Sequence, residues 1–144
     1  MTVHIKKLCV GVEHLDQLRN WQSTQGEVGL DGVKVVRHVT RATPKRGDEV
    51  LADGSIYWVI KGWIMARNEI VALVPVEDAE GRKKCAILLK CGPIEVVPRK
   101  HRPFQGWRYL NASDAPKDLG EFKASKSDTM PPEMVAELND LGLL

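Results

Sequence analysis

The sequence predicts an α+β fold, built as a small curved antiparallel sheet or a partly closed β-barrel with flanking helices. Four β-prone segments follow one another between residues 55 and 97 with short connections, which favours antiparallel pairing. Helical patterns lie outside that region, near both ends of the chain. With 144 residues, the chain is long enough for one domain with its own core.

The first half of the chain alternates strand and helix signals. Residues 3–10 are β-prone, and residues 12–25 place apolar side chains at every third position, which makes one helical face. Residues 33–40 are rich in β-branched side chains and predict a strand. Thr43 and Pro44 predict the start of a short helix, because Thr caps helices and Pro is tolerated in the first turn.

The second half begins with the strongest β signal, at residues 55–64. We expect three further strands, at residues 68–76, 84–90 and 94–97, the first of them stopped by Pro75. These closely spaced strands form the predicted sheet.

Alternation along residues 55–64 predicts which side chains enter the core. Ile56, Trp58 and Ile60 share one face, which we expect to be buried. Tyr57 and Lys61 lie on the other face, so we expect them to line a groove or to contact solvent.

The chain is expected to divide into three parts. Residues 1–119 form a single α+β domain, residues 120–130 a polar linker, and residues 131–144 a C-terminal helix opened by two prolines. This helix either packs on its own domain or binds a protein partner. Its apolar face is expected to consist of Met130, Met134, Leu138 and Leu141.

Several classes of protein are disfavoured. No apolar run reaches the roughly 18 residues of a membrane helix, and the N-terminus does not resemble a secretory signal, so we expect a cytoplasmic protein without membrane contact. Cys9, Cys85 and Cys91 have neither disulfide-framework nor zinc-site spacing, so no metal is expected. No phosphate-loop, dinucleotide or nucleophile motif occurs, so no cofactor is expected and catalytic residues stay unknown.

Charge is unevenly distributed along the chain. The formal net charge is only +2, but residues 41–108 carry 13 Lys and Arg against eight Asp and Glu. Residues 109–144 carry three against seven. The β-rich centre is therefore basic and the C-terminal part acidic, which confines any contact with a polyanion to the centre.

Cations and aromatic rings occur together in the centre of the chain. Arg99, Arg102 and Arg108 flank Phe104 and Trp107. Cations neutralise phosphates and aromatic faces stack on bases, so this segment predicts a nucleic-acid or ligand surface. A solvated sheet edge, or a clamp within the domain, is the alternative interpretation.

Three functions follow from these patterns. The first is a non-catalytic module that binds RNA or a nucleotide. The second is a protein-interaction or structural module that uses the C-terminal helix. The third is a small hydrolase-like enzyme acting on a nucleoside-like or amide substrate, with Lys61 as polar anchor and Glu69 or Asp53 as acid or base.

Three ordered motifs carry a resemblance to a known family. TPKR at residues 43–46, GSIYWVIKG at residues 54–62 and FQGWRYL at residues 104–110 resemble a bacterial family, domain of unknown function 1489. The resemblance covers about residues 1–119 and not the tail. It implies no particular activity.

A weaker, fold-level similarity links the chain to PUA-like domains, the small β-barrels that include ASCH and EVE domains. Members of that group mostly bind RNA or modified nucleobases, and some are hydrolases. The similarity implies a binding groove beside the predicted short helix, near Lys45, Arg46, Tyr57 and Lys61.

Overall fold

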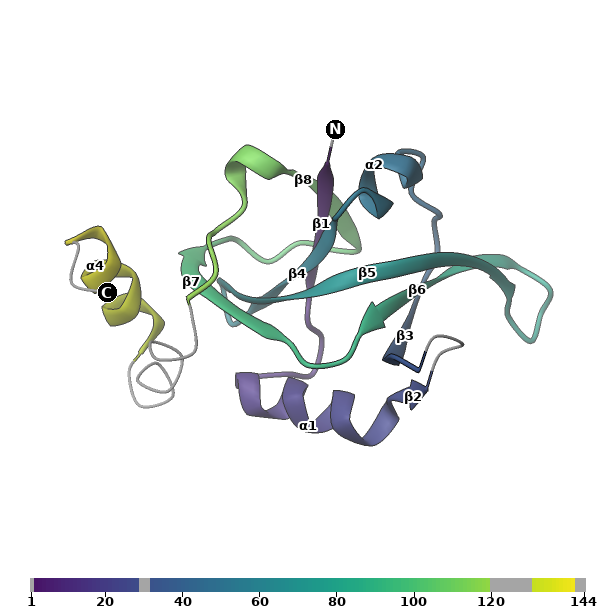
Figure 1. Ribbon diagram of the computed structural model, residues 1–144, viewed down its shortest axis with the longest axis horizontal. Coiled ribbons are helices and arrows are strands. Elements are labelled where there is room, and N and C mark those ends of the chain that lie inside the picture. The colour runs from purple at the N-terminus through teal and green to yellow at the C-terminus, as the bar shows by residue number, and fades with distance from the viewer. Residues whose placement is uncertain (1, 29–31, 120–130, 142–144) are drawn as a thin grey trace.

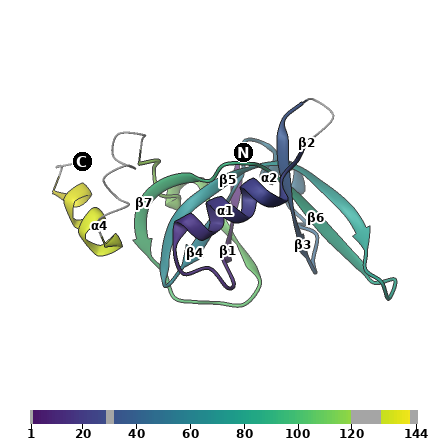
Figure 2. The same ribbon diagram turned by 90° about the horizontal axis from the view of Figure 1, so that it is seen from below.

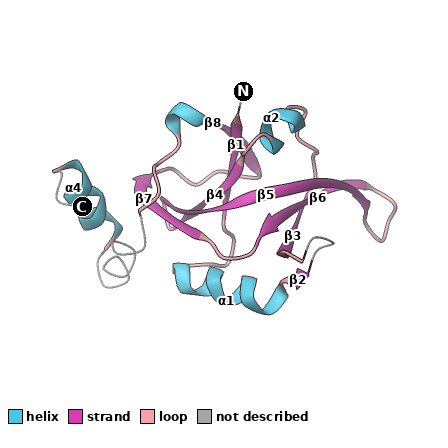
Figure 3. Cartoon of the chain, viewed as in Figure 1, coloured by secondary structure: helices cyan, strands magenta, loops and turns pink. Residues whose placement is uncertain are grey.

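The computed structural model describes residues 2–28, 32–119 and 131–141, and its fold is α+β, as predicted. A curved, open sheet is flanked by helices (Figure 3). The elements are β1 (Val3–Leu8), α1 (Leu15–Gln25), β2 (Glu27–Val28), β3 (Lys34–Thr40), α2 (Gly47–Leu51), β4 (Ser55–Ile60), β5 (Trp63–Glu77), β6 (Lys83–Lys90), β7 (Ile94–Lys100), β8 (Trp107–Asn111), the 3-10 helix η1 (Ala112–Asp114) and α4 (Pro132–Asp140).

The long strand β5 organises the sheet (Figure 1). The strand order is β2-β3-β6-β5-β4-β1-β8, and β7 also pairs with β5. The first half of β5 pairs with β4 and β7, and its second half pairs with β6. Register shifts interrupt all three pairings. Such bulges bend strands, so the sheet curves around its core.

One pair of strands departs from the antiparallel pattern. β1 and β4 are parallel, with Ile5 opposite Ile56, whereas the other strand pairs of the described chain are antiparallel. Parallel neighbours need a long crossover, and here α1, β2, β3 and α2 supply it. Short connections predicted the antiparallel hairpins correctly but carry no information about this distant pair.

The curved sheet leaves a seam, which we define as the gap between β3 and the β1–β8 pair. These strands lie near opposite ends of the strand order and are not paired with each other in the described chain. They nevertheless come close, because side chains from β1, β3 and β8 line a common hollow. The sheet is therefore a partly rolled structure with one open side.

Two turn signals were misread from the sequence. Lys61 and Gly62 have φ values of 49° and 81°, so they form the two-residue turn between β4 and β5 rather than a strand interior. Pro75 does not end its strand, because β5 continues to Glu77. Pro75 has no backbone N–H, so one edge of β5 lacks a hydrogen-bond donor there. The pairing of β4 with β5 reaches no further than Glu69, so it does not need that donor.

The short helix α2 begins later than Thr43 and Pro44 predicted. Its first residue is Gly47, and Arg46 precedes it with a non-helical backbone. The backbone N–H of Arg46 donates to the hydroxyl of Tyr109 on β8 at 3.1 Å. This bond holds the preceding segment against β8, so the helix forms only after it.

β4 is buried on both faces, which corrects the expected position of Tyr57. Ile56, Trp58 and Ile60 enter the main core as predicted. Tyr57 is only 4% exposed and packs with Val59 in a second cluster on the opposite face. Alternation assigns the two faces correctly but cannot show that the loop after β7 covers the second one.

The C-terminal helix α4 lies beside β7 at one end of the molecule (Figure 2). Its buried residue is Val135, at 1% exposure, whereas Met134 and Leu141 are largely exposed. The predicted apolar face is therefore about one residue out of step with the face that the structure buries. Met130, which was expected on that face, lies outside the described residues.

Candidate functional site

The sequence-predicted binding residues lie in several separate places. Lys45 is exposed ahead of α2, and Lys61 occupies the β4–β5 turn, with its Nζ 3.8 Å from a carboxylate oxygen of Glu13. Tyr57 is buried in β4. The groove expected beside the short helix does not bring these three side chains together.

Arg46 is engaged by its own neighbours. Its guanidinium donates to both carboxylate oxygens of Glu49, at 2.6 and 2.9 Å. The same group lies 5.3 Å from the centre of the Tyr109 ring, within cation–π range. Arg46 therefore ties α2 to β8.

The basic and aromatic loop after β7 turns inward over the sheet. Phe104 packs in the second cluster, and the cations of Arg108 and Lys6 lie 5.8 and 6.0 Å from the centre of its ring. Lys6 also donates to the ring of His101 at 2.9 Å. This is the arrangement of an internal clamp, the alternative interpretation of the segment.

The other two arginines of the segment flank this clamp. Arg99 donates to the backbone carbonyl of Asp114, which holds the chain after β8 against β7. Arg102 has an exposed side chain, and its backbone carbonyl lies 2.7 Å from Nδ1 of His101. Neither arginine lines the seam.

A basic hollow of about 690 Å³ lies at one end of the seam. Lys7 of β1, residues 39–42 at the end of β3 and residues 105–108 at the start of β8 line it. Lys7 and Arg41 supply its positive charge, and none of the lining residues is acidic. Arg108 also lines the hollow, but its guanidinium lies over Phe104, on the face of β8 opposite Trp107. Trp107 lies directly opposite Lys7 in the pairing of β1 with β8. The hollow therefore combines positive charge with an aromatic ring.

An apolar pocket of about 360 Å³ adjoins the basic hollow, and Lys7 lines both. Residues 8–12, which follow Lys7, form one wall, and α1 contributes Leu18 and Trp21. His38 of β3 and Trp58 of β4 complete it, with their rings edge to face and 5.2 Å between centroids. Both volumes lie in the range of roughly 300–1,000 Å³ typical of small-molecule sites.

Two titratable side chains of the apolar pocket, His38 and Cys9, are neutral near pH 7. Burial, with a smaller contribution from Lys7, lowers the pKa of His38 to about 4. Burial raises the pKa of Cys9 to about 11, so its thiol is protonated and a poor nucleophile. The pocket thus suits a neutral apolar group, and the hollow beside it suits an anion.

A polar network in the core holds α1 against this pocket. Gln22 and Asn68, each 1% exposed, exchange two amide hydrogen bonds of 2.8 Å. Asn68 also accepts from the indole N–H of Trp58 at 2.9 Å and donates to the carbonyl of Lys90 at 2.9 Å. Trp21, the neighbour of Gln22, is thereby positioned at the rim of the pocket with 38% exposure.

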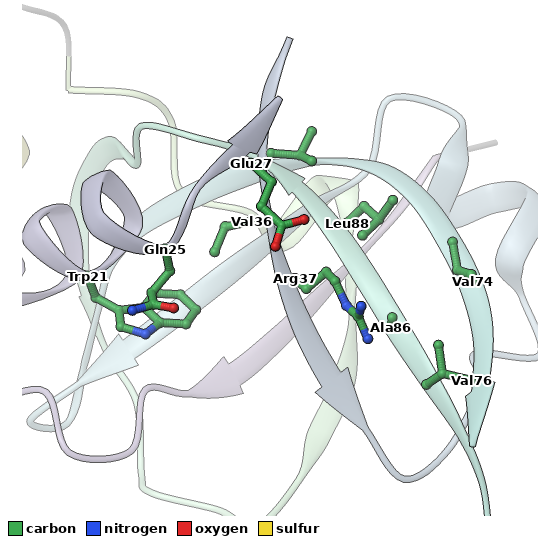
Figure 4. A pocket seen from close by; sticks show the side chains of 10 residues that line it. Trp21, Gln25, Glu27, Val36, Arg37, Val74, Val76, Ala86 and Leu88 are labelled. Atoms are coloured by element: carbon green, nitrogen blue, oxygen red, sulfur yellow. The ribbon is translucent and has the colours of Figure 1, made fainter. Parts of the chain in front are cut away.

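Trp21 also borders a third hollow, of about 430 Å³, on the outer face of β3, β5 and β6. Figure 4 shows Trp21 at one end and Arg37 near the middle, with Val74 and Leu88 among the lining side chains. Glu27 lies on the same wall as Arg37. Its mixed charge distinguishes this hollow from the basic one at the seam.

The expected enzymatic residues are only partly gathered. Asp53 and Glu69 line a further hollow of about 350 Å³ together with Arg67. Arg67 donates to both carboxylate oxygens of Asp118 at 2.8 Å, which lowers the pKa of Asp118. Lys61 lies at the opposite end of the β4–β5 hairpin, so it does not act as an anchor for this pair.

Sequence reasoning missed most of the seam. Of the predicted residues only Arg108 lines it, whereas Lys7, Arg41, His38 and Trp21 were not singled out. These residues belong to β1, β3 and α1, which are far apart in the sequence. Lys7 precedes an apolar run ended by Gly11, but that signal does not indicate which strand lies across the gap.

Comparison with protein families gives one match. The model of the family described as protein of unknown function (DUF1489) matches residues 5–144. The chain belongs to this family. In this DUF1489 chain the match includes the C-terminal tail, so the expected limit near residue 119 was wrong. No curated protein and no solved structure matches the chain, and the similarity to PUA-like domains stays a prediction.

Two absences concern the described part of this DUF1489 chain. Residues 2–28, 32–119 and 131–141 contain no helix that is both long and apolar enough to cross a membrane. The same residues contain no cluster of three His, Cys, Asp or Glu side chains suited to a metal ion.

Proposed function

We propose that the seam binds a phosphate-bearing ligand, RNA or a nucleotide, without chemical conversion. The observation that carries this proposal is the basic hollow, where Lys7 and Arg41 lie near Trp107 with no acidic residue in the lining. Cations that are not neutralised by the chain's own carboxylates attract phosphates, and an adjacent ring offers a stacking face.

The groups near the seam support binding rather than catalysis. With a pKa of about 4, His38 is a weak base at pH 7, the thiol of Cys9 is protonated, and the acidic pair Asp53 and Glu69 lines a different hollow. A general base or nucleophile must reach the bound ligand. The lining of the two seam pockets contains no carboxylate that could act as such a base.

The test is a titration of the full chain with a short single-stranded RNA at two salt concentrations, followed by tryptophan fluorescence. We expect affinity to fall steeply with salt, because phosphate contacts release counterions. Arg41→Ala should weaken binding about tenfold and reduce the salt slope by about one. Binding that is absent, or insensitive to salt, would overturn the proposal.

Arg82→Ala is the matched control. Arg82 is an exposed arginine in the turn between β5 and β6, paired with Glu80, and lines neither seam pocket. We expect this variant to bind like the wild type. An equal loss in both variants would mean that RNA responds to total charge rather than to the basic hollow.

A further inference from the structure

Building on the proposed function, we infer that the apolar pocket holds the base of one nucleotide while Lys7 and the basic hollow hold its phosphate. Lys7 lines both spaces, so they adjoin, and the proposed ligand spans them at Lys7. A nucleotide has the matching division, with an anionic end and a flat, uncharged ring. The apolar pocket is then a base-binding subsite next to a surface that otherwise contacts only phosphate.

The pocket lining favours a flat ring over an aliphatic chain. Trp21, Trp58 and His38 supply aromatic surfaces from three different elements. Trp21 keeps 38% of its surface exposed at the rim, where stacking on a ligand would remove it from water. Stacking on such faces is the common way in which proteins hold unpaired bases.

The pocket also offers a fixed hydrogen-bond donor. The side-chain oxygen of Gln17 accepts from the backbone N–H groups of Glu13 and His14, at 2.6 and 3.1 Å. This pair of bonds fixes which way the amide faces, and its NH₂ group is left to donate. Gln17 lines the pocket, so a carbonyl or ring nitrogen of a base is a suitable acceptor.

The experiment compares an intact single-stranded RNA with the same chain lacking its bases. We expect the full-length wild type to bind the intact strand about tenfold more tightly, the effect of stacking one base. Equal, salt-dependent affinity for both strands would overturn the base subsite and leave the proposed function standing. Failure of both strands to bind would overturn the inference and the proposed function together.

Three substitutions at Trp21 separate stacking from simple apolar contact. Trp21→Phe keeps a ring and should retain most of the preference for the intact strand. Trp21→Leu and Trp21→Ala should abolish the preference without changing affinity for the strand lacking bases. Leu141→Ala, at a residue 64% exposed directly after α4, is the control and should change neither affinity. A preference that survives in Trp21→Leu would overturn the inference.

Small competitors show whether a free nucleotide shares the site. Uridine monophosphate should displace the labelled RNA at lower concentration than ribose 5-phosphate, because only the former carries a base. Octyl phosphate presents an aliphatic chain with the same anion. Competition by octyl phosphate as strong as that by the nucleotide would identify an aliphatic pocket and overturn the inference.

Discussion

Arg46, Arg99 and Arg108 carry the same guanidinium group but have different neighbours in the fold. Arg46 is held by Glu49 and Tyr109, and Arg99 by a backbone carbonyl. Arg108 lies against the ring of Phe104 and also lines the basic hollow. An arginine neutralised by its own chain contributes little to an anion site, so residue type alone does not identify a ligand contact.

His38 gives a pH-dependent stability at the residue scale. Its pKa is about 4 in the folded chain and near 6.5 when unfolded, so between these values the unfolded state binds the proton more readily. The free energy of unfolding should therefore fall as the pH drops from about 6.5 to 4, by at most about 3 kcal/mol.

Urea denaturation of the wild type and His38→Phe at pH 7 and pH 4.5 measures this effect. The variant should lose much of the pH dependence, because it has no proton to take up at this position. Some dependence should remain, since burial also lowers the pKa of His4. If the free energy of unfolding falls between pH 7 and pH 4.5 as much in His38→Phe as in the wild type, the prediction is contradicted.

At the scale of elements, α1 is attached to the sheet by both apolar and polar contacts. Leu15 and Leu18 enter the core, and Gln22 reaches Asn68 on β5. Asn68 uses both of its oxygen lone pairs and both of its N–H groups in these and neighbouring bonds. Such a saturated buried network positions the helix that carries Trp21.

Asn68→Ala should therefore destabilise the fold by about 3 kcal/mol, because it leaves the NH₂ group of Gln22 and the indole N–H of Trp58 buried without partners. Urea denaturation measures the loss. Asn20→Ala, at an exposed position on α1, is the control and should change the free energy of unfolding little. A loss in Asn68→Ala no larger than in the control would contradict the role of the network.

At the scale of the whole molecule, the curvature of the sheet creates the candidate site. Bulges in the pairings of β5 bring strands from opposite ends of the strand order to the two sides of one seam. Ligand sites often occupy the mouth of such a rolled sheet, where side chains converge without filling the space. The helix α4 lies at β7 and contributes no lining residue to either seam pocket.

At the same scale, the packing of Val135 predicts that α4 unfolds together with the sheet. Val135 is 1% exposed, so Val135→Ala should lower the free energy of unfolding of the whole chain by about 2 kcal/mol. Tryptophan fluorescence reports that transition from outside α4, because all four tryptophans, including the buried Trp58, lie in residues 21–107. Met134→Ala, at a residue 48% exposed on the same helix, should have little effect. Equal stability of both variants would support a separate helix after a linker.

Local patterns predicted the parts of the molecule that depend on neighbours in sequence. Alternation separated Trp58 from Tyr57, and helical spacing put Leu15 and Leu18 on one face of a helix, which the structure buries. The turn at Lys61 escaped prediction, because a lysine with positive φ interrupts an otherwise continuous β pattern. The turn lies at Lys61 because β4 and β5 pair on either side of it, and not because lysine favours a positive φ.

The sequence by itself determined the α+β class, the basic centre and the family to which the chain belongs. Only the tertiary structure decided which cations stay available, because ion pairs and cation–π contacts join residues distant in sequence, such as Arg46 and Tyr109. It also decided where Lys7 and Arg41 meet. Strand curvature and pairing set that meeting point, and both arise from contacts among many residues that no local pattern contains.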